Sequence, residues 1–375
     1  MKGRRNEEEN PVNKTILIIV VALLVFSLAG MAFGPGKDRD RKGPIQITTD
    51  ARYDRNPDAV RTHDGKIWLF YTRGRNPIGV RGVSGYDPDA DVYDIYFRTA
   101  RNPDELVTAP ENLVPGSDLV TVNSQRDIAV VEARDKSIWL FASSGYASSA
   151  DFSVFYYRYT RRDGWTGPTA VPDTAVAGHI DAVAVGDRIF LFYENWPYIV
   201  KVMSTDGFSW TPAVTIREKA TLPKAVFQHD RFFLAWSYLD MDAGVWGKYI
   251  GLSTSKDGVN WMTVGPIAAW PDATNWDPVL IEGPRPEHGP GGLTLVWAPD
   301  TGSSGQILAE TTARNPMEVA SWSAPKALTV AATETISWWD FWPNAADDVP
   351  ALFFTSESDA AGAGMIDGNI WMFRR

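Results

Sequence analysis

Cysteine is absent from this 375-residue chain, and its absence excludes several kinds of chemistry. No disulfide framework, thiolate metal site or cysteine nucleophile can form. Histidine is scarce too, since only four copies occur, at positions 63, 179, 229 and 288. They lack the close spacing of a zinc motif, and no contiguous calcium-loop pattern is present. The sequence therefore predicts no cofactor.

Positive charge is in short supply beyond the N-terminal segment. The whole chain carries a net charge of −10, and residues 43–375 contain 28 basic and 41 acidic residues, a net charge of −13. An anionic surface repels nucleic acid and anionic lipid. We therefore expect neither as a partner of this part of the chain.

The N-terminal segment contains a run of 19 uncharged residues, Thr15 to Phe33. At 1.5 Å per residue in a helix, such a run spans the hydrocarbon core of a bilayer. Four basic residues precede it, which favours a cytoplasmic N-terminus. This predicts a cytoplasmic N-terminus over 1–14, a transmembrane anchor over 15–33, a linker over 34–42 and a folded domain over 43–375.

A cleaved signal peptide is the alternative for the same segment, because Gly30-Met31-Ala32 resembles a small-residue cleavage site. We favour the anchor, since the apolar run is longer than the apolar region of a usual signal peptide. Both interpretations place residues 43–375 outside the cytoplasm. The expected location is the cell membrane with a single span, or the secreted fraction if the segment is cleaved.

A short apolar phrase of the type Ile-Trp-Leu-Phe-Tyr recurs six times after the linker. Its copies begin 71, 51, 43, 61 and 58 residues apart, at Ile67, Ile138, Ile189, Phe232, Leu293 and Ala351. Each phrase is apolar on both faces, as in a strand buried between neighbouring sheets. Short strands repeated at this period are typical of a β-propeller with one blade per copy.

The segments around each phrase complete a four-stranded blade. A shorter strand precedes the phrase, and a third strand with a tight turn follows it, as in 204–210 and 255–261, which share the pattern S-x-D-G-x-x-W. The last unit lacks its outer strand, which the segment 45–49 can supply. We therefore predict an all-β, six-bladed β-propeller of four-stranded blades, with the N-terminal strand closing the last blade, after an N-terminal transmembrane helix.

Acidic residues open most of the first strands, which line the central channel of a propeller. Repeat alignment places five carboxylates near the channel mouth, with Lys224 in the sixth place: Asp58, Asp127, Asp181, Asp277 and Asp340. Clustered carboxylates raise the pKa values of one another, and a carboxylic acid beside a carboxylate is what glycoside cleavage needs. These five are the predicted catalytic residues, with Asp58 the first choice. The alternative is that each Asp only caps backbone N–H groups.

Basic and aromatic residues flank these carboxylates and are the predicted substrate-binding set. They are Arg55, Arg126, His179, Lys224, Trp276 and Trp339. Tryptophan faces can stack on sugar rings, and cationic groups can bind an anionic substituent. A Ca²⁺ ion held by several of the carboxylates is an alternative use of the same ring.

The first repeat carries the most specific resemblance to a known family. Arg55-Asn56-Pro57 is followed by a strand, an Asp64-Gly65 turn and a strand that ends near Arg73. Together with the S-x-D-G-x-x-W turns, this resembles the sialidase (neuraminidase) superfamily over about 43–375. The resemblance implies that Arg55 binds a substrate carboxylate and that a glycan is the partner. A sialidase uses a tyrosine nucleophile late in the chain, whereas no tyrosine follows Tyr249 here.

These observations lead to two classes of function. The first is an extracytoplasmic, membrane-anchored propeller that acts on glycans, as a glycoside hydrolase using the channel-mouth carboxylates. The alternative is a non-catalytic cell-surface propeller that binds a glycan or a protein, or that has a structural part in the cell envelope.

Overall fold

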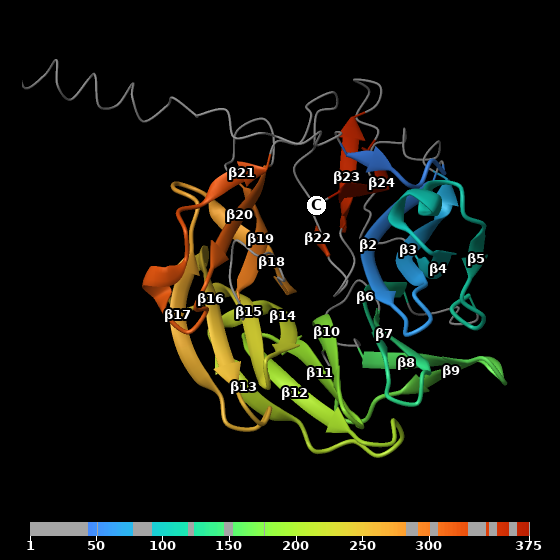
Figure 1. Cartoon of the computed structure of the whole chain (residues 1–375), viewed down its shortest axis with the longest axis horizontal. Helices are drawn as coiled ribbons and strands as arrows, with labels where there is room; N and C mark the ends of the chain where they lie inside the picture. Colours follow the sequence, from blue (N-terminus) through green and yellow to red (C-terminus); the bar gives the residue numbers. More distant parts are fainter. Residues whose placement is uncertain are drawn as a thin grey trace, which may run out of the picture. The chain divides into compact units, whose positions relative to one another are not determined.

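The computed structural model describes most of the chain beyond the N-terminal segment. The described residues are 44–50, 52–77, 92–118, 124–145, 153–175, 177–282, 292–300, 307–328, 343–344, 351–359 and 366–374. Gly43–Arg375 forms one compact unit. It consists of six four-stranded antiparallel sheets arranged as blades around a central axis (Figure 1).

The first three blades follow one another along the chain. Blade 1 contains β2 (Arg52–Arg61), β3 (Ile67–Pro77), β4 (Tyr93–Ala100) and β5 (Glu111–Leu113). Blade 2 contains β6 (Ser124–Glu132), β7 (Ile138–Gly145), β8 (Ser153–Thr160) and β9 (Gly164–Ala170). Blade 3 contains β10 (Gly178–Val185), β11 (Arg188–Asn195), β12 (Tyr198–Ser204) and β13 (Val214–Glu218).

The remaining blades complete the ring. Blade 4 contains β14 (Ala220–Gln228), β15 (Arg231–Asp240), β16 (Val245–Ser255) and β17 (Met262–Ala268). Blade 5 contains β18 (Thr274–Glu282), β19 (Leu293–Asp300), β20 (Leu308–Ala313) and β21 (Lys326–Leu328). Blade 6 contains β22 (Pro343–Asn344), β23 (Ala351–Asp359), β24 (Ile366–Arg374) and the N-terminal β1 (Ile45–Gln46).

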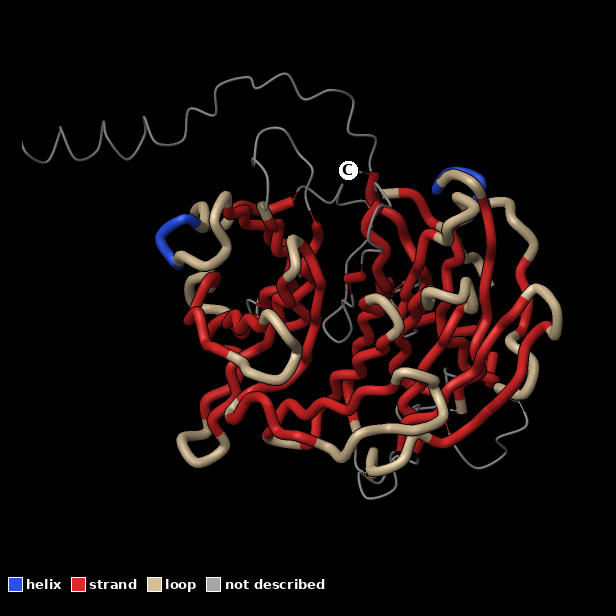
Figure 2. Tube along the Cα trace, turned by 60° about the horizontal axis from the view of Figure 1, so that its bottom comes forward, coloured by secondary structure: helices blue, strands red, loops and turns tan. Residues whose placement is uncertain are grey.

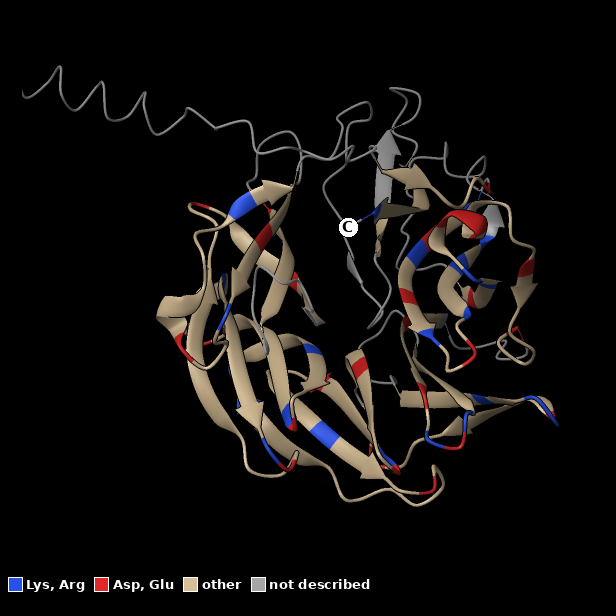
Figure 3. Ribbon diagram, viewed as in Figure 1, with Lys and Arg blue, Asp and Glu red and all other residues tan. Residues whose placement is uncertain are grey.

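Strands dominate the described residues, with two short 3₁₀ turns, Pro103–Val107 and Val319–Ser321, as the helical elements among them (Figure 2). Figure 3 marks the positions of acidic and basic residues on the ribbon, where both kinds are interspersed over the blades. The predicted all-β six-bladed fold is confirmed, as is closure of the last blade by the N-terminal strand.

The six apolar phrases lie in the second strand of each blade, where they form the core between blades. Leu69, Phe141, Leu191 and Leu234 are completely buried. The buried apolar clusters join neighbouring sheets, so Phe141 of β7 shares a cluster with Leu191 of β11. Each blade therefore buries both of its faces only when it has a neighbour on each side.

The two S-x-D-G-x-x-W turns tie blades 3 and 4 to the blades that precede them. Asp206 accepts hydrogen bonds from the backbone N–H groups of Phe208 and Ser209, at 2.7 and 2.6 Å. Gly207 has a φ of 78°, and a Cβ there would lie 1.8 Å from the ring of Trp139 in blade 2. Only glycine fits both the left-handed backbone and this close approach.

Ring closure depends on the segment that follows β1. Ile45 and Gln46 pair with Met372 and Trp371 of β24, and the backbone N–H of Ile47 donates to Ile370 at 2.8 Å. The hydroxyl of Thr48 accepts from the backbone N–H of Ile370. The first described residues thus form the outer strand of the last blade.

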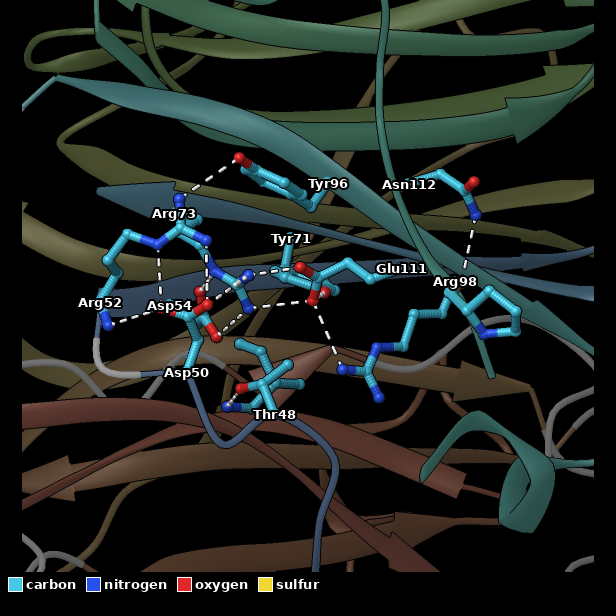
Figure 4. A network of polar contacts seen from close by, with 12 residues as sticks. Thr48, Asp50, Arg52, Asp54, Tyr71, Arg73, Tyr96, Arg98, Glu111 and Asn112 are labelled. Atoms are coloured by element: carbon cyan, nitrogen blue, oxygen red, sulfur yellow. Dashed lines mark hydrogen bonds and ion pairs between the residues drawn. The ribbon is translucent and has the colours of Figure 1, made fainter. Parts of the chain in front are cut away.

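A buried arginine then joins this closing segment to blade 1 (Figure 4). Arg73 of β3 is 1% exposed and forms ion pairs with Asp50, Asp54 and Glu111. Its Nη2 donates to Asp54 Oδ2 at 2.8 Å and to Glu111 Oε2 at 3.0 Å. Burial raises the pKa of Asp54 to about 6, although the ion pair with Arg73 opposes the rise.

The predicted membrane anchor, 15–33, lies outside the described residues. Within the ranges that the structure describes, no helix is long and apolar enough to cross a membrane.

Replacing Arg73 with methionine is expected to lower the free energy of unfolding by about 3–5 kcal/mol, because it leaves the fully buried Asp54 without its cation. The matched control is Arg75→Met, which removes a partly exposed ion pair with Asp94 and should cost about 1 kcal/mol or less. Urea unfolding followed by tryptophan fluorescence measures both. Equal losses in the two variants would contradict a closing role for Arg73.

Candidate functional site at the channel mouth

Strand register separates the predicted carboxylates into two levels along the channel. Asp58, Asp181 and Lys224 each pair with the fourth residue of the apolar phrase on the next strand. In blades 2 and 5 the residues that pair with the fourth phrase residue are Ala129 and Val279. Asp127 and Asp277 therefore lie two residues closer to the strand start than the sequence alignment implied.

The residues two positions before the paired level form the mouth of the channel. They occur at or beside breaks in strand register and are Asn56, Asp127, His179, Leu222 and Asp277. All five line one pocket of about 40 Å³, together with the residue that follows each of them and with Lys224. We call this the mouth pocket. β-Bulges of this kind re-aim side chains and often lie beside functional sites.

Three of the mouth residues adopt a left-handed backbone without being glycine. Asn56, Leu222 and Asp277 have φ values of 51°, 55° and 49°. Such a conformation costs on the order of 1–3 kcal/mol at a non-glycine residue and persists only where the surrounding structure imposes it. The same strained position thus recurs in three blades around one pocket.

Polar groups from blades 1 and 3 lie beside Asp127 of blade 2. Asn56 donates from Nδ2 to Asp127 Oδ1 at 3.0 Å. His179 Nδ1 lies 3.5 Å from Asp127 Oδ2. The side chains of Asp127 and His179 are 16% and 33% exposed, so both remain within reach of solvent. The hydrogen bond from Asn56 orients the Asp127 carboxylate at the opening.

The inner level is occupied by carboxylates that bind backbone. Asp58 accepts from the N–H groups of Ala59 and Val130, both at 2.7 Å, and Asp181 accepts from Ala225 at 2.6 Å. Val130 and Ala225 each follow the equivalent position in the next blade. Asp58 and Asp181 therefore link neighbouring blades through hydrogen bonds to backbone. This is the role that the alternative interpretation gave to these residues, namely capping of backbone N–H groups.

Burial affects the pKa values of the charged side chains at the inner level. It raises the pKa of Asp58 to about 7, against the opposing charge of Lys224, and it also raises the pKa of Asp181. Lys224 Nζ lies 3.5 Å from Asp181 Oδ1. Burial alone would lower the pKa of Lys224, but the nearby carboxylates outweigh it and the pKa is raised. Lys224 lines both the mouth pocket and a second cavity of about 240 Å³ further along the channel.

The remaining predicted site residues lie in varied places. The guanidinium of Arg55 packs over the ring of Tyr93, 4.1 Å from its centroid, and Arg55 is 4% exposed. Trp276 is half-buried on β18. Asp340, Trp339 and the side chain of Arg126 lie outside the described part of the chain. The roles predicted for the site residues remain predictions.

Asn56 and Leu222 are mouth residues that the sequence analysis did not select. Asn56 was visible only as part of the Arg-Asn-Pro motif, and Leu222 carried no chemical signal. Their shared left-handed backbone becomes apparent only in the folded ring.

No group of three or more His, Asp or Glu side chains that could hold a metal ion occurs among the residues that the structure describes. The mouth pocket offers Asp127, Asp277 and His179 on separate blades. The calcium alternative for the carboxylate ring thus has no supporting cluster in the described ranges.

Comparison with known proteins yields similarity at the level of structure. No protein-family model and no curated sequence matches the chain. A protein of unknown function from Dyadobacter fermentans has a TM-score of 0.64 at 13% identity, over 89% of this chain and 99% of that one. The α-L-arabinofuranosidase Arb93A of Fusarium graminearum has a TM-score of 0.58 at 11% identity, over 89% and 98%.

A sialidase of Trypanosoma rangeli is also similar, with a TM-score of 0.57 at 10% identity over 90% of this chain. The match covers 57% of the sialidase chain. The expected resemblance to sialidase propellers is confirmed for the fold. At these identities the likeness concerns the fold alone, because one propeller scaffold carries many functions.

The raised pKa of Asp58 predicts a pH-dependent contribution to stability. Asp58 has a pKa of about 7 when folded, against about 4 for an unfolded Asp, so its contribution is fully present below pH 4 and is lost as the pH rises to 7. The free energy of unfolding should fall relative to that of Asp58→Asn by up to about 1.4 kcal/mol per pH unit in this window. Urea titrations at pH 4, 5.5 and 7 measure it. A pH-independent difference would refute the protonated, buried Asp58.

Proposed function

We propose that the propeller binds a glycan at the mouth pocket and hydrolyses a glycosidic bond there. The observation that carries this proposal is the convergence of Asn56, Asp127, His179 and Asp277 on one opening, at bulges that hold strained backbone in three blades. Strain of this kind is concentrated at functional sites. The structural neighbours include enzymes named as an arabinofuranosidase and a sialidase, which supports a carbohydrate ligand.

Two carboxyl groups are the minimum that most glycosidases need, one to protonate the leaving oxygen and one to act as nucleophile or base. Asp127 supplies the oriented carboxylate, because Asn56 donates a hydrogen bond to it and His179 lies 3.5 Å away. Asp277 supplies the second carboxyl on the same pocket. Lys224 contributes a positive charge at the base of the pocket, which suits an anionic sugar.

A non-catalytic glycan-binding propeller is the second candidate, and two observations favour it. Asp58 and Asp181 are engaged by backbone N–H groups rather than facing an open site. The mouth pocket, at about 40 Å³, is also small beside the roughly 300 Å³ of a typical small-molecule site.

Turnover of fluorogenic α-L-arabinofuranosides and sialosides by the full chain in detergent tests the proposal. Asp127→Asn and Asp277→Asn should each lower kcat by about 10²-fold or more, since each removes a group with acid–base or nucleophilic work. The matched control, Asp187→Asn, changes an exposed Asp outside the mouth pocket and should leave kcat unchanged. Full activity in both mouth variants would refute this site. Glycan binding without turnover would favour the second candidate.

We further propose that residues 15–33 anchor the chain in the cell membrane, with the propeller outside the cytoplasm. In bacterial cells the full chain should stay in the membrane pellet after alkaline carbonate extraction, because 19 uncharged residues match the bilayer core. Added protease should digest the propeller in spheroplasts. The matched control replaces Leu23 and Leu24 with Arg, which should release the chain from the pellet. A mature N-terminus just after Ala32, found by mass spectrometry, would show a cleaved signal peptide instead.

A further inference from the structure

Two large aromatic side chains from neighbouring blades form an exposed pair. Trp196 follows β11 in blade 3 and is 47% exposed, and Trp246 on β16 in blade 4 is 45% exposed. Their ring centroids lie 5.3 Å apart with an interplanar angle of 75°. Tyr198 and Met241, at 40% and 49% exposed, lie in the same two hairpins as the Trp residues. Contiguous exposed apolar surface on a soluble domain marks an interaction site.

Backbone hydrogen bonds hold this pair in place. Trp196 lies in a two-residue hairpin between Asn195 and Tyr198, and Trp246 pairs with Leu239 across blade 4. The start of β14 lies between the two hairpins. Ala220 donates from its backbone N–H to Pro197, and Lys219 accepts from Leu239 at 3.0 Å. Both rings are thus held at the ends of paired strands. Because this backbone is already ordered, less conformational entropy of the protein is lost when a ligand binds.

Polar groups accompany the rings. Lys219 Nζ lies 2.7 Å from Asp240 Oδ2, and the hydroxyl of Tyr238 donates to the same oxygen at 3.0 Å. The register places Asp240 opposite Val245, the residue before Trp246 in β16. A sugar ring has an apolar C–H face and a rim of hydroxyl groups. This surface offers both an aromatic platform and donors and acceptors at its edge.

The segment between the two hairpins leads along the chain into the mouth pocket. Lys219, which contacts Asp240, is followed after Ala220 and Thr221 by Leu222, Pro223 and Lys224, which line the pocket. At about 3.3 Å per residue of extended strand, about 10 Å of chain separates Lys219 from Leu222. One extended ligand can therefore reach both places.

We propose that Trp196 and Trp246 form a second glycan subsite, which holds a sugar ring of an oligosaccharide or polysaccharide whose neighbouring units occupy the mouth pocket. The inference rests on the proposed glycan function and adds the class of substrate, a chain of several sugars rather than a single terminal residue. The polar cluster of Lys219, Tyr238 and Asp240 favours this ligand over a lipid surface.

Binding to short and long glycans tests the inference with the full chain in detergent. The probes are arabinobiose and sialyllactose, and linear arabinan and polysialic acid. Trp196→Ala and Trp246→Ala should each weaken binding to the polymer that the wild type binds by about tenfold, and leave binding to the matching short glycan unchanged. Phe208→Ala is the matched control, because Phe208 is 67% exposed in the turn between β12 and β13, and it should change neither affinity.

Distinct outcomes overturn the two proposals. Polymer affinity that is kept in both Trp variants and lost in Asp127→Asn refutes the second subsite but retains the mouth site. Trp variants that lose binding to phosphatidylglycerol vesicles when Leu23 and Leu24 are also replaced with Arg, with polymer affinity unchanged, identify a lipid contact instead. If the wild type binds none of the four glycans, both proposals fail. Trp246→Phe keeps an aromatic face, so partial retention of polymer affinity there separates stacking from misfolding.

Discussion

The pairing of β1 with β24 is the interaction on which the whole ring depends. Each blade has two apolar faces, and both are buried only when six blades meet in a closed circle. The cluster between blades 6 and 1 contains Ile47, Leu69 and Phe353, which come from both ends of the domain. Arg73 adds a buried ionic link to Asp50, just after the closing strand. Contacts between distant parts of the sequence therefore hold the first and last blades together.

A difference of two positions along the inner strands separates the carboxylates that bind backbone from those that line the mouth pocket. At the inner level, Asp58 and Asp181 satisfy backbone N–H groups of the next blade, which would otherwise be buried without acceptors. At the mouth, the contacts of Asp127 described above are with the side chains of Asn56 and His179. Aspartate thus holds blades together at the inner level and is available to a ligand at the mouth.

Several features were predictable because they follow from local patterns. The apolar phrases identified the second strands, and the S-x-D-G-x-x-W turns identified the tight turns after the third strands of blades 3 and 4. The candidate site was only partly predictable. Asp127, His179, Asp277 and Lys224 were selected from sequence and do meet at one pocket, but Asn56 and Leu222 were not selected. Alignment of Asp58 with Asp127 failed because Asp58 lies three residues before the hairpin pair Arg61–Ile67, whereas Asp127 lies five residues before the equivalent pair Glu132–Ile138.

The sequence by itself determined the number of blades, their strand order and the chemical types available near the axis, because each of these depends on short-range periodicity. Only the tertiary structure decided which carboxylates reach the opening and which are buried against backbone. It also decided that Trp196 and Trp246, 50 positions apart, share one exposed surface. Register and inter-blade packing are properties of the closed ring, so no local pattern encodes them.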